Sequence, residues 1–195
     1  MNKKLIKEFF DNLASEWDNN MKKDDTIMSI ILDNAEVSKG KDVLDVACGT
    51  GVMIDYYLER DVKSITGVDF SNKMCEIATQ KYKNYNNVKI ICEDIEDYNS
   101  DMKYDSIIVY NSFPHFPNAE KLISQLSNLL KEGGILTIAH GMSRDSINNH
   151  HSDVSYEIKD DLIEADQLAQ IFSKYLQVTT IISNDKMYQV AGKRI

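Results

Sequence analysis

Short apolar runs alternate with amphipathic stretches through the middle of this chain, and this alternation limits the possible folds more than any other feature. The apolar runs have the length of buried strands and occupy residues 42–47, 64–69, 88–92, 104–110 and 134–139. Behind a capping serine, Ser71, the residues Met74, Ile77, Ala78 and Tyr82 fall on one helical face. Alternating strands and helices predict a doubly wound, mostly parallel α/β sheet of the Rossmann-like type.

Further elements are expected at both ends of this core. Residues 5–20 and 24–36 have helical patterns, and residues 176–183 and 186–192 meet at Asn184-Asp185 as an antiparallel hairpin. The hairpin brings the predicted sheet to seven strands. Ligands of such sheets bind beyond the carboxyl ends of the parallel strands, so the loops after these strands are the places to search for a site.

The bulk composition narrows the function. The length of 195 residues fits one domain, and a net charge of −9 repels phosphate, so nucleic acid is not expected as a partner. No apolar run approaches the roughly 20 residues of a membrane span, and the first ten residues lack the apolar stretch of a signal peptide. The three cysteines contain no CxxC pair, which argues against a disulfide framework or a cysteine zinc site. We expect a cytoplasmic protein without a membrane partner.

A glycine-rich turn follows the first apolar run, in the sequence V-L-D-V-A-C-G-T-G of residues 43–51. Such turns often bind the diphosphate of a dinucleotide, but that motif needs a third small residue where this chain has Ile54. Asp45, within the strand, would also repel a diphosphate. A carboxylate there favours a cation, such as an ammonium or a sulfonium.

Two further acids follow the second and third apolar runs. Asp69 lies where a ribose-binding acid is expected, and the adjacent Phe70 offers an apolar surface for a base. Asp94 follows the third run and is suited to an adenine amino group, with Ile95 packing on the ring. This set suits an adenosine ligand whose other end is cationic rather than phosphorylated.

These segments resemble the class I S-adenosylmethionine-dependent methyltransferases that act on small molecules. The resemblance rests on five segments in the family's order over about residues 40–140: V-L-D-V-A-C-G-T-G, G-V-D-F-S, E-D-I-E, Y-D-S-I-I-V-Y-N-S-F and L-K-E-G-G-I-L-T-I. The stretch F-D-N-L-A-S-E-W-D of residues 10–18 resembles the helix that closes over the cofactor in many members. The family implies S-adenosylmethionine as cofactor and a small-molecule methyl acceptor.

The resemblance also implies roles for individual residues and segments. Asp45, Gly49 and Gly51 would lie along the methionine part, together with Ala47, which stands where the family often has a glycine. Asp69 would hold the ribose, Asp94 and Ile95 would flank the adenine beside Phe70, and Asn111 would lie near the sulfonium. Trp17 would belong to the lid. The single domain would comprise a helical lid (1–37), a cofactor-binding core (38–140) and an acceptor-side segment with the sheet edge (141–195).

The four histidines all fall on the expected ligand side. His115 and His140, with Arg144, are our candidates for acceptor binding or general-base catalysis. Surface or capping histidines are an equally open interpretation. A third is a metal site formed by His140, His150, His151 and Asp153, although adjacent histidines seldom bind one ion together. We predict no metal as the leading case.

Three functions of the whole chain are compatible with these patterns. The first is methyl transfer to a small molecule. The second is a nucleotide-dependent oxidoreductase, which Ile54 and Asp45 disfavour. The third is a non-catalytic module that binds S-adenosylmethionine. The fourth motif, Y-N-S-F, differs from the N-P-P-Y type associated with amino-group methylation of bases and glutamine, but it does not select an acceptor atom. Nothing in the sequence indicates the oligomeric state.

Overall fold

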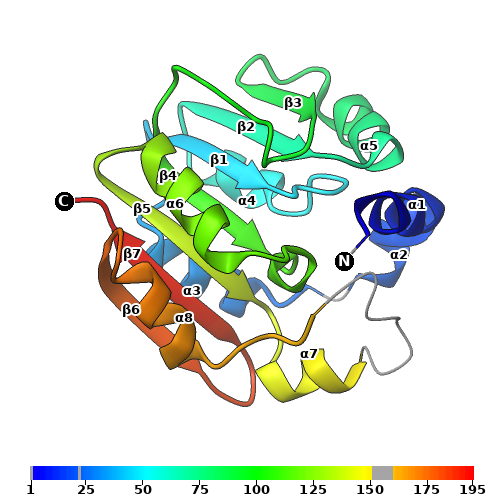
Figure 1. The fold of residues 1–195 in the computed structure, drawn as a ribbon. Helices are drawn as coiled ribbons and strands as arrows, with labels where there is room; N and C mark the ends of the chain where they lie inside the picture. The colour runs from blue at the N-terminus through cyan, green and yellow to red at the C-terminus, as the bar shows by residue number, and fades with distance from the viewer. Residues whose placement is uncertain (1, 22, 151–159) are drawn as a thin grey trace.

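A seven-stranded sheet forms the centre of the molecule in the computed structural model, which describes residues 2–21, 23–150 and 160–195 (Figure 1). The strand order is β3-β2-β1-β4-β5-β7-β6. The strands are β1 (Asp42–Val46), β2 (Ser64–Asp69), β3 (Val88–Cys92), β4 (Tyr104–Tyr110), β5 (Leu130–His140), β6 (Gln177–Ser183) and β7 (Tyr188–Lys193). Strands β1 to β5 are parallel, whereas β7 runs antiparallel between β5 and β6. The predicted fold class and the terminal hairpin are confirmed.

The order of the sheet reverses between β1 and β4. Strand β1 pairs with β2 on one side and with β4 on the other, so the chain winds outward in both directions from this point. The loops that follow the two central strands therefore leave in opposite directions. Their divergence opens a crevice above the carboxyl ends of these strands. The sequence analysis predicted a ligand-binding site at this position, beyond the carboxyl ends of the parallel strands.

Strand β5 differs from its expected extent. The sequence predicted a strand over residues 134–139, but the strand begins at Leu130 and includes Gly133 and Gly134. The preceding helix ends at Leu129, before both glycines. A Cβ at Gly134 would lie 2.9 Å from the carbonyl oxygen of Tyr104, so glycine here permits close strand pairing rather than stopping a helix.

Helices cover both faces of the sheet (Figure 1). Helices α6 and α8 pack on one face with Leu44 and Ile107, and α3 and α4 pack on the other with Val43 and Ile65. The expected caps are present, since the Ser71 hydroxyl accepts a hydrogen bond from the amide of Met74 at 3.2 Å. The helices are α1 (Lys3–Leu13), α2 (Trp17–Asn20), α3 (Asp25–Asn34), α4 (Ile54–Glu59), α5 (Asn72–Tyr82), α6 (Ala119–Leu129), α7 (Arg144–His150) and α8 (Ala165–Phe172), with short 3-10 turns η1 (Ala14–Glu16) and η2 (Phe113–His115).

The N-terminal residues Lys3–Asn20, which we call the lid, comprise α1, η1 and α2. They lie beyond the carboxyl ends of the strands and beside α5 (Figure 1). Among the helices of the described residues, none has both the length and the apolar character needed to cross a membrane.

Candidate functional site

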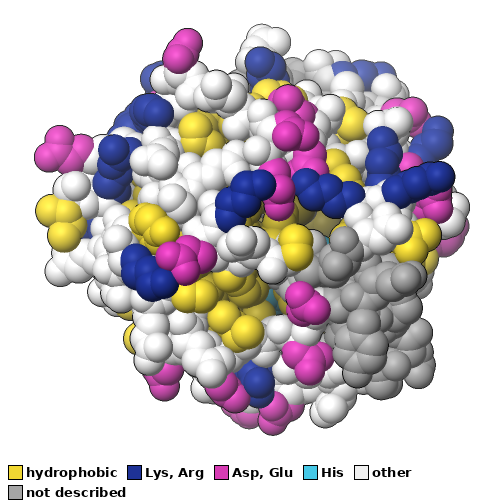
Figure 2. All heavy atoms as spheres, in the orientation of Figure 1, with side chains coloured by type: hydrophobic (Ala, Val, Ile, Leu, Met, Phe, Trp, Pro, Cys, Tyr) yellow, Lys and Arg dark blue, Asp and Glu magenta, His cyan; other side chains and the backbone are white. Residues whose placement is uncertain are grey.

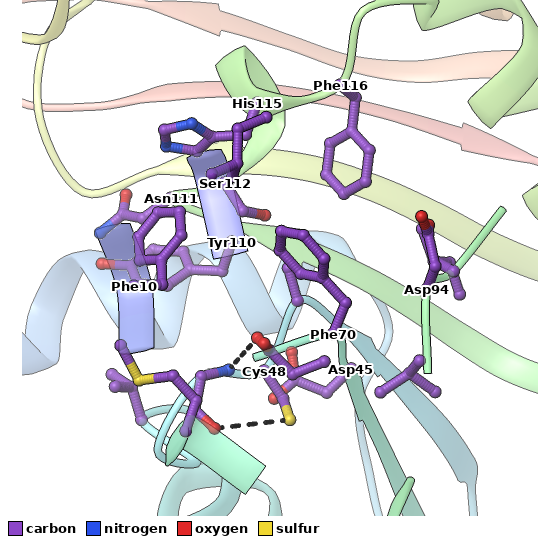
Figure 3. Close-up of a pocket in the computed structure, with 18 of the residues that line it drawn as sticks. Phe10, Asp45, Cys48, Phe70, Asp94, Tyr110, Asn111, Ser112, His115 and Phe116 are labelled. Carbon is purple, nitrogen blue, oxygen red and sulfur yellow. Dashed lines mark hydrogen bonds between the residues drawn. The ribbon is translucent and has the colours of Figure 1, made fainter. Parts of the chain in front are cut away.

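A pocket lies between the lid and the carboxyl ends of β1, β2 and β4 (Figure 3). Its lining comes mainly from the lid, the glycine turn after β1, the loops after β2 and β3, and the segment after β4, with the ends of the strands themselves. The lining residues are Lys3, Ile6, Phe10, Trp17, Met21, Asp45, Ala47, Cys48, Gly49, Val52, Met53, Val68, Asp69, Phe70, Met74, Glu93, Asp94, Ile95, Glu96, Tyr110, Asn111, Ser112, His115, Phe116 and Pro117.

The glycine turn has a left-handed backbone at three alternate positions. Ala47, Gly49 and Gly51 have φ values of 54°, 56° and 87°. Gly49 lies beneath the lid, because a Cβ there would be 3.8 Å from the indole nitrogen of Trp17. Gly51 lies outside the pocket, and a Cβ there would approach the ring of Tyr82 to 2.5 Å. Gly49 thus lines the pocket, whereas the absence of a side chain at Gly51 allows Tyr82 of α5 to pack against the turn.

Asp45 is a buried carboxylate at the floor of the pocket. It is 2% exposed, and its Oδ2 atom makes no hydrogen bond to any described residue. Burial and the nearby Asp69 raise its pKa to about 8, against a lowering by Tyr57. An acid that is so poorly neutralised by its own protein favours a positive charge placed beside it.

Asp69 is also buried but is far better satisfied. One carboxylate oxygen accepts the amide of Gly49 and the other accepts the amide of Ser71, each at 2.8 Å. Burial raises the pKa of Asp69, and these backbone hydrogen bonds oppose the rise. The side chain therefore connects the end of β2 to the glycine turn, and Phe70 follows it along the pocket wall (Figure 3).

Asp94 and Ile95 form the far end of the pocket after β3. Ile95 is buried within the hydrophobic core, and Asp94 lies at the pocket rim. Both oxygens of Asp94 are engaged, since Oδ1 accepts the amide of Glu96 at 2.9 Å and Oδ2 lies 2.6 Å from the ammonium of Lys3. Asp45, Asp69 and Asp94 thus line one continuous cavity, as the sequence suggested.

Asn111 follows β4 at the opposite end. It has a left-handed φ of 52°, and its Oδ1 atom accepts the amide of Gly141 at 3.1 Å. The preceding Tyr110 also lines the pocket, and a Cβ on Gly141 would clash with its hydroxyl. Burial, above all, raises the pKa of Tyr110 to about 12, so its hydroxyl stays a hydrogen-bond donor at neutral pH. Sequence analysis missed Tyr110, although its place at the end of a core strand was a usable signal.

Aromatic rings close this end of the pocket. Phe10 contacts Trp17 edge to face at 5.7 Å between ring centroids and contacts His115 at 5.0 Å. Figure 3 shows Phe10, Tyr110, Asn111 and His115 grouped together, away from Asp94. The pocket therefore has an acidic end and an aromatic end.

The lid is held to the core by polar contacts along its length. Asp11 accepts the Ser71 hydroxyl at 2.6 Å, at the N-terminus of α5. Asp18 accepts the Thr50 hydroxyl at 2.6 Å and pairs with Lys81 at 2.9 Å. These contacts place the lid directly over the glycine turn and the loop after β2.

The acceptor-side candidates do not come together. Of His115, His140 and Arg144, only His115 lines the pocket. His140 is 2% exposed, with its ring against that of Tyr188. Arg144 donates from Nε to the carbonyl oxygen of Leu162 at 2.8 Å, so it anchors the chain after β5.

Three of the four residues of the metal hypothesis have side chains that the structure does not describe. His151, Asp153 and the side chain of His150 lie outside the described residues. Within the part of the chain that the structure describes, no group of three or more histidine, cysteine, aspartate or glutamate residues could hold a metal ion.

Comparison with known proteins finds similarity to methyltransferases. Residues 43–134 match the model of a methyltransferase domain, and this segment carries the glycine turn and all three acids. This match supports the resemblance to class I S-adenosylmethionine-dependent methyltransferases. The chain is 32% identical to a malonyl-[acyl-carrier protein] O-methyltransferase of Acetivibrio thermocellus over 71% of its own length and 50% of the relative's. It is 26% identical to a second such enzyme of Ilyobacter polytropus, over 91% of the chain and 69% of the relative.

Solved structures support the same fold. The magnesium protoporphyrin IX methyltransferase of Synechocystis PCC 6803, with S-adenosylhomocysteine bound, superposes with a TM-score of 0.74 at 17% identity. That alignment covers 100% of both chains. The chain spans about half the length of the first curated relative it matches.

Proposed function

We propose that this chain binds S-adenosylmethionine in the pocket and transfers its methyl group to a small-molecule acceptor. The observation that carries the proposal is Asp45, a buried carboxylate without a cation of its own among the described residues. S-adenosylmethionine brings an ammonium and a sulfonium, which such a floor favours. A dinucleotide would bring negative phosphates to the same place, which argues against the oxidoreductase alternative.

The remaining lining fits the other parts of this cofactor. Gly49, whose backbone has a left-handed φ of 56°, lies beneath Trp17 and would face the methionine part. Asp69, fixed by two backbone amides, is placed to accept the ribose hydroxyls, and Asp94 with Ile95 and Phe70 forms the adenine end. The cofactor supplies an activated methyl group, so the chain's own residues need chiefly to orient the acceptor and exclude water.

The aromatic end is then the acceptor side. Phe10, Trp17 and Tyr110 form its apolar walls, and His115 is a lining group suited to take a proton near neutral pH. We propose His115 as the general base for acceptors that must lose a proton. His140 and Arg144 would instead hold the chain that follows β5. The relatives named above act on different acceptors, so they leave the acceptor of this chain open.

The function is tested with methyl-labelled S-adenosylmethionine and a cell extract. The purified protein should transfer label to a small molecule, and calorimetry should show binding of S-adenosylmethionine but not of NADH. Binding without transfer to any extract component would favour the non-catalytic module, and tight NADH binding alone would contradict the proposal.

The role of His115 has its own test once a labelled product is found. His115→Asn should reduce methyl transfer by roughly 100-fold or more, while the affinity for S-adenosylmethionine stays within about twofold. Arg144→Ala is the matched control, because Arg144 contacts Leu162 rather than the pocket. It should lower thermal stability more than the rate. Full activity of His115→Asn would remove the general base from the proposal.

A further inference from the structure

The acid at the adenine end is already occupied by the protein's own lysine. Lys3, the first residue of the lid helix α1, places its ammonium 2.6 Å from Oδ2 of Asp94. The other oxygen of Asp94 accepts the amide of Glu96 at 2.9 Å. Since an adenine amino group is also a hydrogen-bond donor, it and Lys3 seek the same carboxylate oxygen.

Lys3 lies in the cavity wall as well as in the ion pair. Lys3, Asp94 and Glu96 all line the pocket, and Figure 2 shows acidic and basic side chains beside a hollow with hydrophobic side chains within it. Their side chains are only partly exposed, at 49% for Lys3 and 22% for Asp94. Entry of an adenine ring at this end would meet the lysine directly.

We propose that Lys3 competes with the adenine end of the cofactor for the Asp94 carboxylate, so cofactor binding must first release this ion pair. The inference rests on the proposed function, because it takes Asp94 as the adenine acid. Lys3 would thereby lower the affinity for the cofactor and couple the position of the lid to occupancy of the pocket.

A second acid makes the exchange possible without loss of the lid. Glu96 lies 3.1 Å from the Lys3 ammonium and also pairs with Lys121 at 2.7 Å. When Lys3 leaves Asp94, it can remain beside Glu96. Elsewhere on α1, Asp11 keeps its contact with Ser71. The helix therefore needs only to shift its first turn, rather than detach.

The neighbouring lysine provides a matched control. Lys4 is on the same helical turn, but its side chain is 83% exposed and faces Glu8 at 3.8 Å. Lys3→Ala and Lys4→Ala remove the same charge from the same helix, but only Lys3→Ala removes the contacts with Asp94 and Glu96. Equal melting temperatures of the two variants would show that both retain the fold.

The test measures binding of S-adenosylhomocysteine by calorimetry at low ionic strength. Lys3→Ala should bind roughly two- to fivefold more tightly than the wild type, as expected for removal of a partly exposed ion pair, and Lys4→Ala should match the wild type. High salt should shrink the difference between Lys3→Ala and the wild type. In an Asp94→Asn background, Lys3→Ala should have no effect.

A kinetic readout uses Trp17, since the sequence contains one tryptophan and it lies in the lid. Its fluorescence change on mixing with S-adenosylhomocysteine should be faster in Lys3→Ala than in Lys4→Ala. Unchanged or weaker binding by Lys3→Ala would overturn the competition while leaving the proposed function intact. Absence of binding by every form, wild type included, would overturn both.

Discussion

The central strand β1 has a buried aspartate at its amino end and another near its carboxyl end, and the surrounding residues that the structure describes neutralise only the first. We call these two ends of the parallel strands the amino-end edge and the carboxyl-end edge of the sheet. At the amino-end edge, Asp42 is 4% exposed and accepts hydrogen bonds from the Ser64 hydroxyl at 2.6 Å and the Lys131 ammonium at 2.7 Å. Three residues later on the same strand, Asp45 has no cation paired with it among the described residues. One strand thus places a neutralised acid at one end and an uncompensated acid at the other.

The pKa values express this difference. Burial alone would raise the pKa of Asp42, but its hydrogen bonds to Lys131 and Ser64 and the nearby Lys63 outweigh burial and lower it. Burial and Asp69 raise the pKa of Asp45 to about 8. A buried acid that the protein neutralises itself contributes to stability, whereas one left without a cation is available to a ligand. The contrast separates the residues that hold the sheet from those that serve the pocket.

The largest expected effect comes from removing the uncompensated charge. Asp45→Asn should weaken S-adenosylmethionine binding by roughly 10- to 100-fold, because a charge-assisted contact is worth about 1.5–3 kcal/mol. The melting temperature of the free protein at neutral pH should stay the same or rise, since a raised pKa of about 8 already keeps most of the Asp45 carboxyl protonated and the amide is also neutral. Calorimetry and thermal denaturation measure the two quantities. A loss of stability with unchanged affinity would show that Asp45 stabilises the fold rather than binds the cofactor.

At the amino-end edge, we expect substitution of Asp42 to change stability rather than affinity. Asp42→Asn keeps the side-chain shape but loses the attraction of Lys131 and Lys63, so the free energy of unfolding should fall by about 1–2 kcal/mol. Denaturant titration measures this change. The affinity for S-adenosylmethionine should remain that of the wild type. A loss of affinity in both aspartate variants would contradict the division between a stabilising Asp42 and a cofactor-binding Asp45.

The pH dependence sharpens the comparison further. Because the pKa of Asp45 is raised to about 8, the folded free protein holds a proton that the unfolded chain loses above its ordinary value of 3.8. This group therefore makes the free protein less stable as pH rises from about 4 to 8. Asp42 has a lowered pKa, so its contribution is present at neutral pH and is lost only as acid protonates it in the folded state.

The same proton should appear in cofactor binding. If the ammonium of S-adenosylmethionine binds the ionised form of Asp45, affinity should rise with pH by up to about tenfold per unit below the pKa. The useful range ends near pH 7.5, because α-amino groups lose their own proton at about 7.7–8.0. 5′-Methylthioadenosine, which lacks the amino acid part, is the control and should show little pH dependence. Equal slopes for both ligands would contradict the role of Asp45.

Local patterns were sufficient to predict the fold and the acidic end of the pocket. Strand length, helical periodicity and capping residues are properties of short segments, so they identified the sheet and its hairpin. Asp45, Asp69 and Asp94 were found because each stands at or just after the end of a parallel strand, and those ends meet at one edge. Their burial and pairing could not be predicted, because these depend on which cations other segments bring near.

The aromatic end was harder to predict. Whether the last residue of a strand faces the pocket or the core depends on how far the strand extends. Tyr110 ends β4 and lines the pocket, whereas His140 ends β5 and packs against Tyr188. Lys3 was missed for a similar reason, since its contact with Asp94 depends on the orientation of a lid 91 residues away in sequence.

The smallest expected effect concerns Ala47, which stands where the resembling family often has a glycine. The backbone there has a φ of 54°, a left-handed conformation that costs a residue with a Cβ about 1 kcal/mol. Ala47→Gly should therefore stabilise the free protein by up to about 1 kcal/mol, less what the more flexible unfolded chain takes back. Gly49→Ala has a similar φ of 56° and room for a Cβ, so it should shift stability by a similar amount in the opposite direction. Denaturant titration of both variants compares the two positions. If Ala47→Gly proved the less stable of the pair, the strain would lie elsewhere in the turn, because Ala47→Gly removes a Cβ from a left-handed position whereas Gly49→Ala adds one.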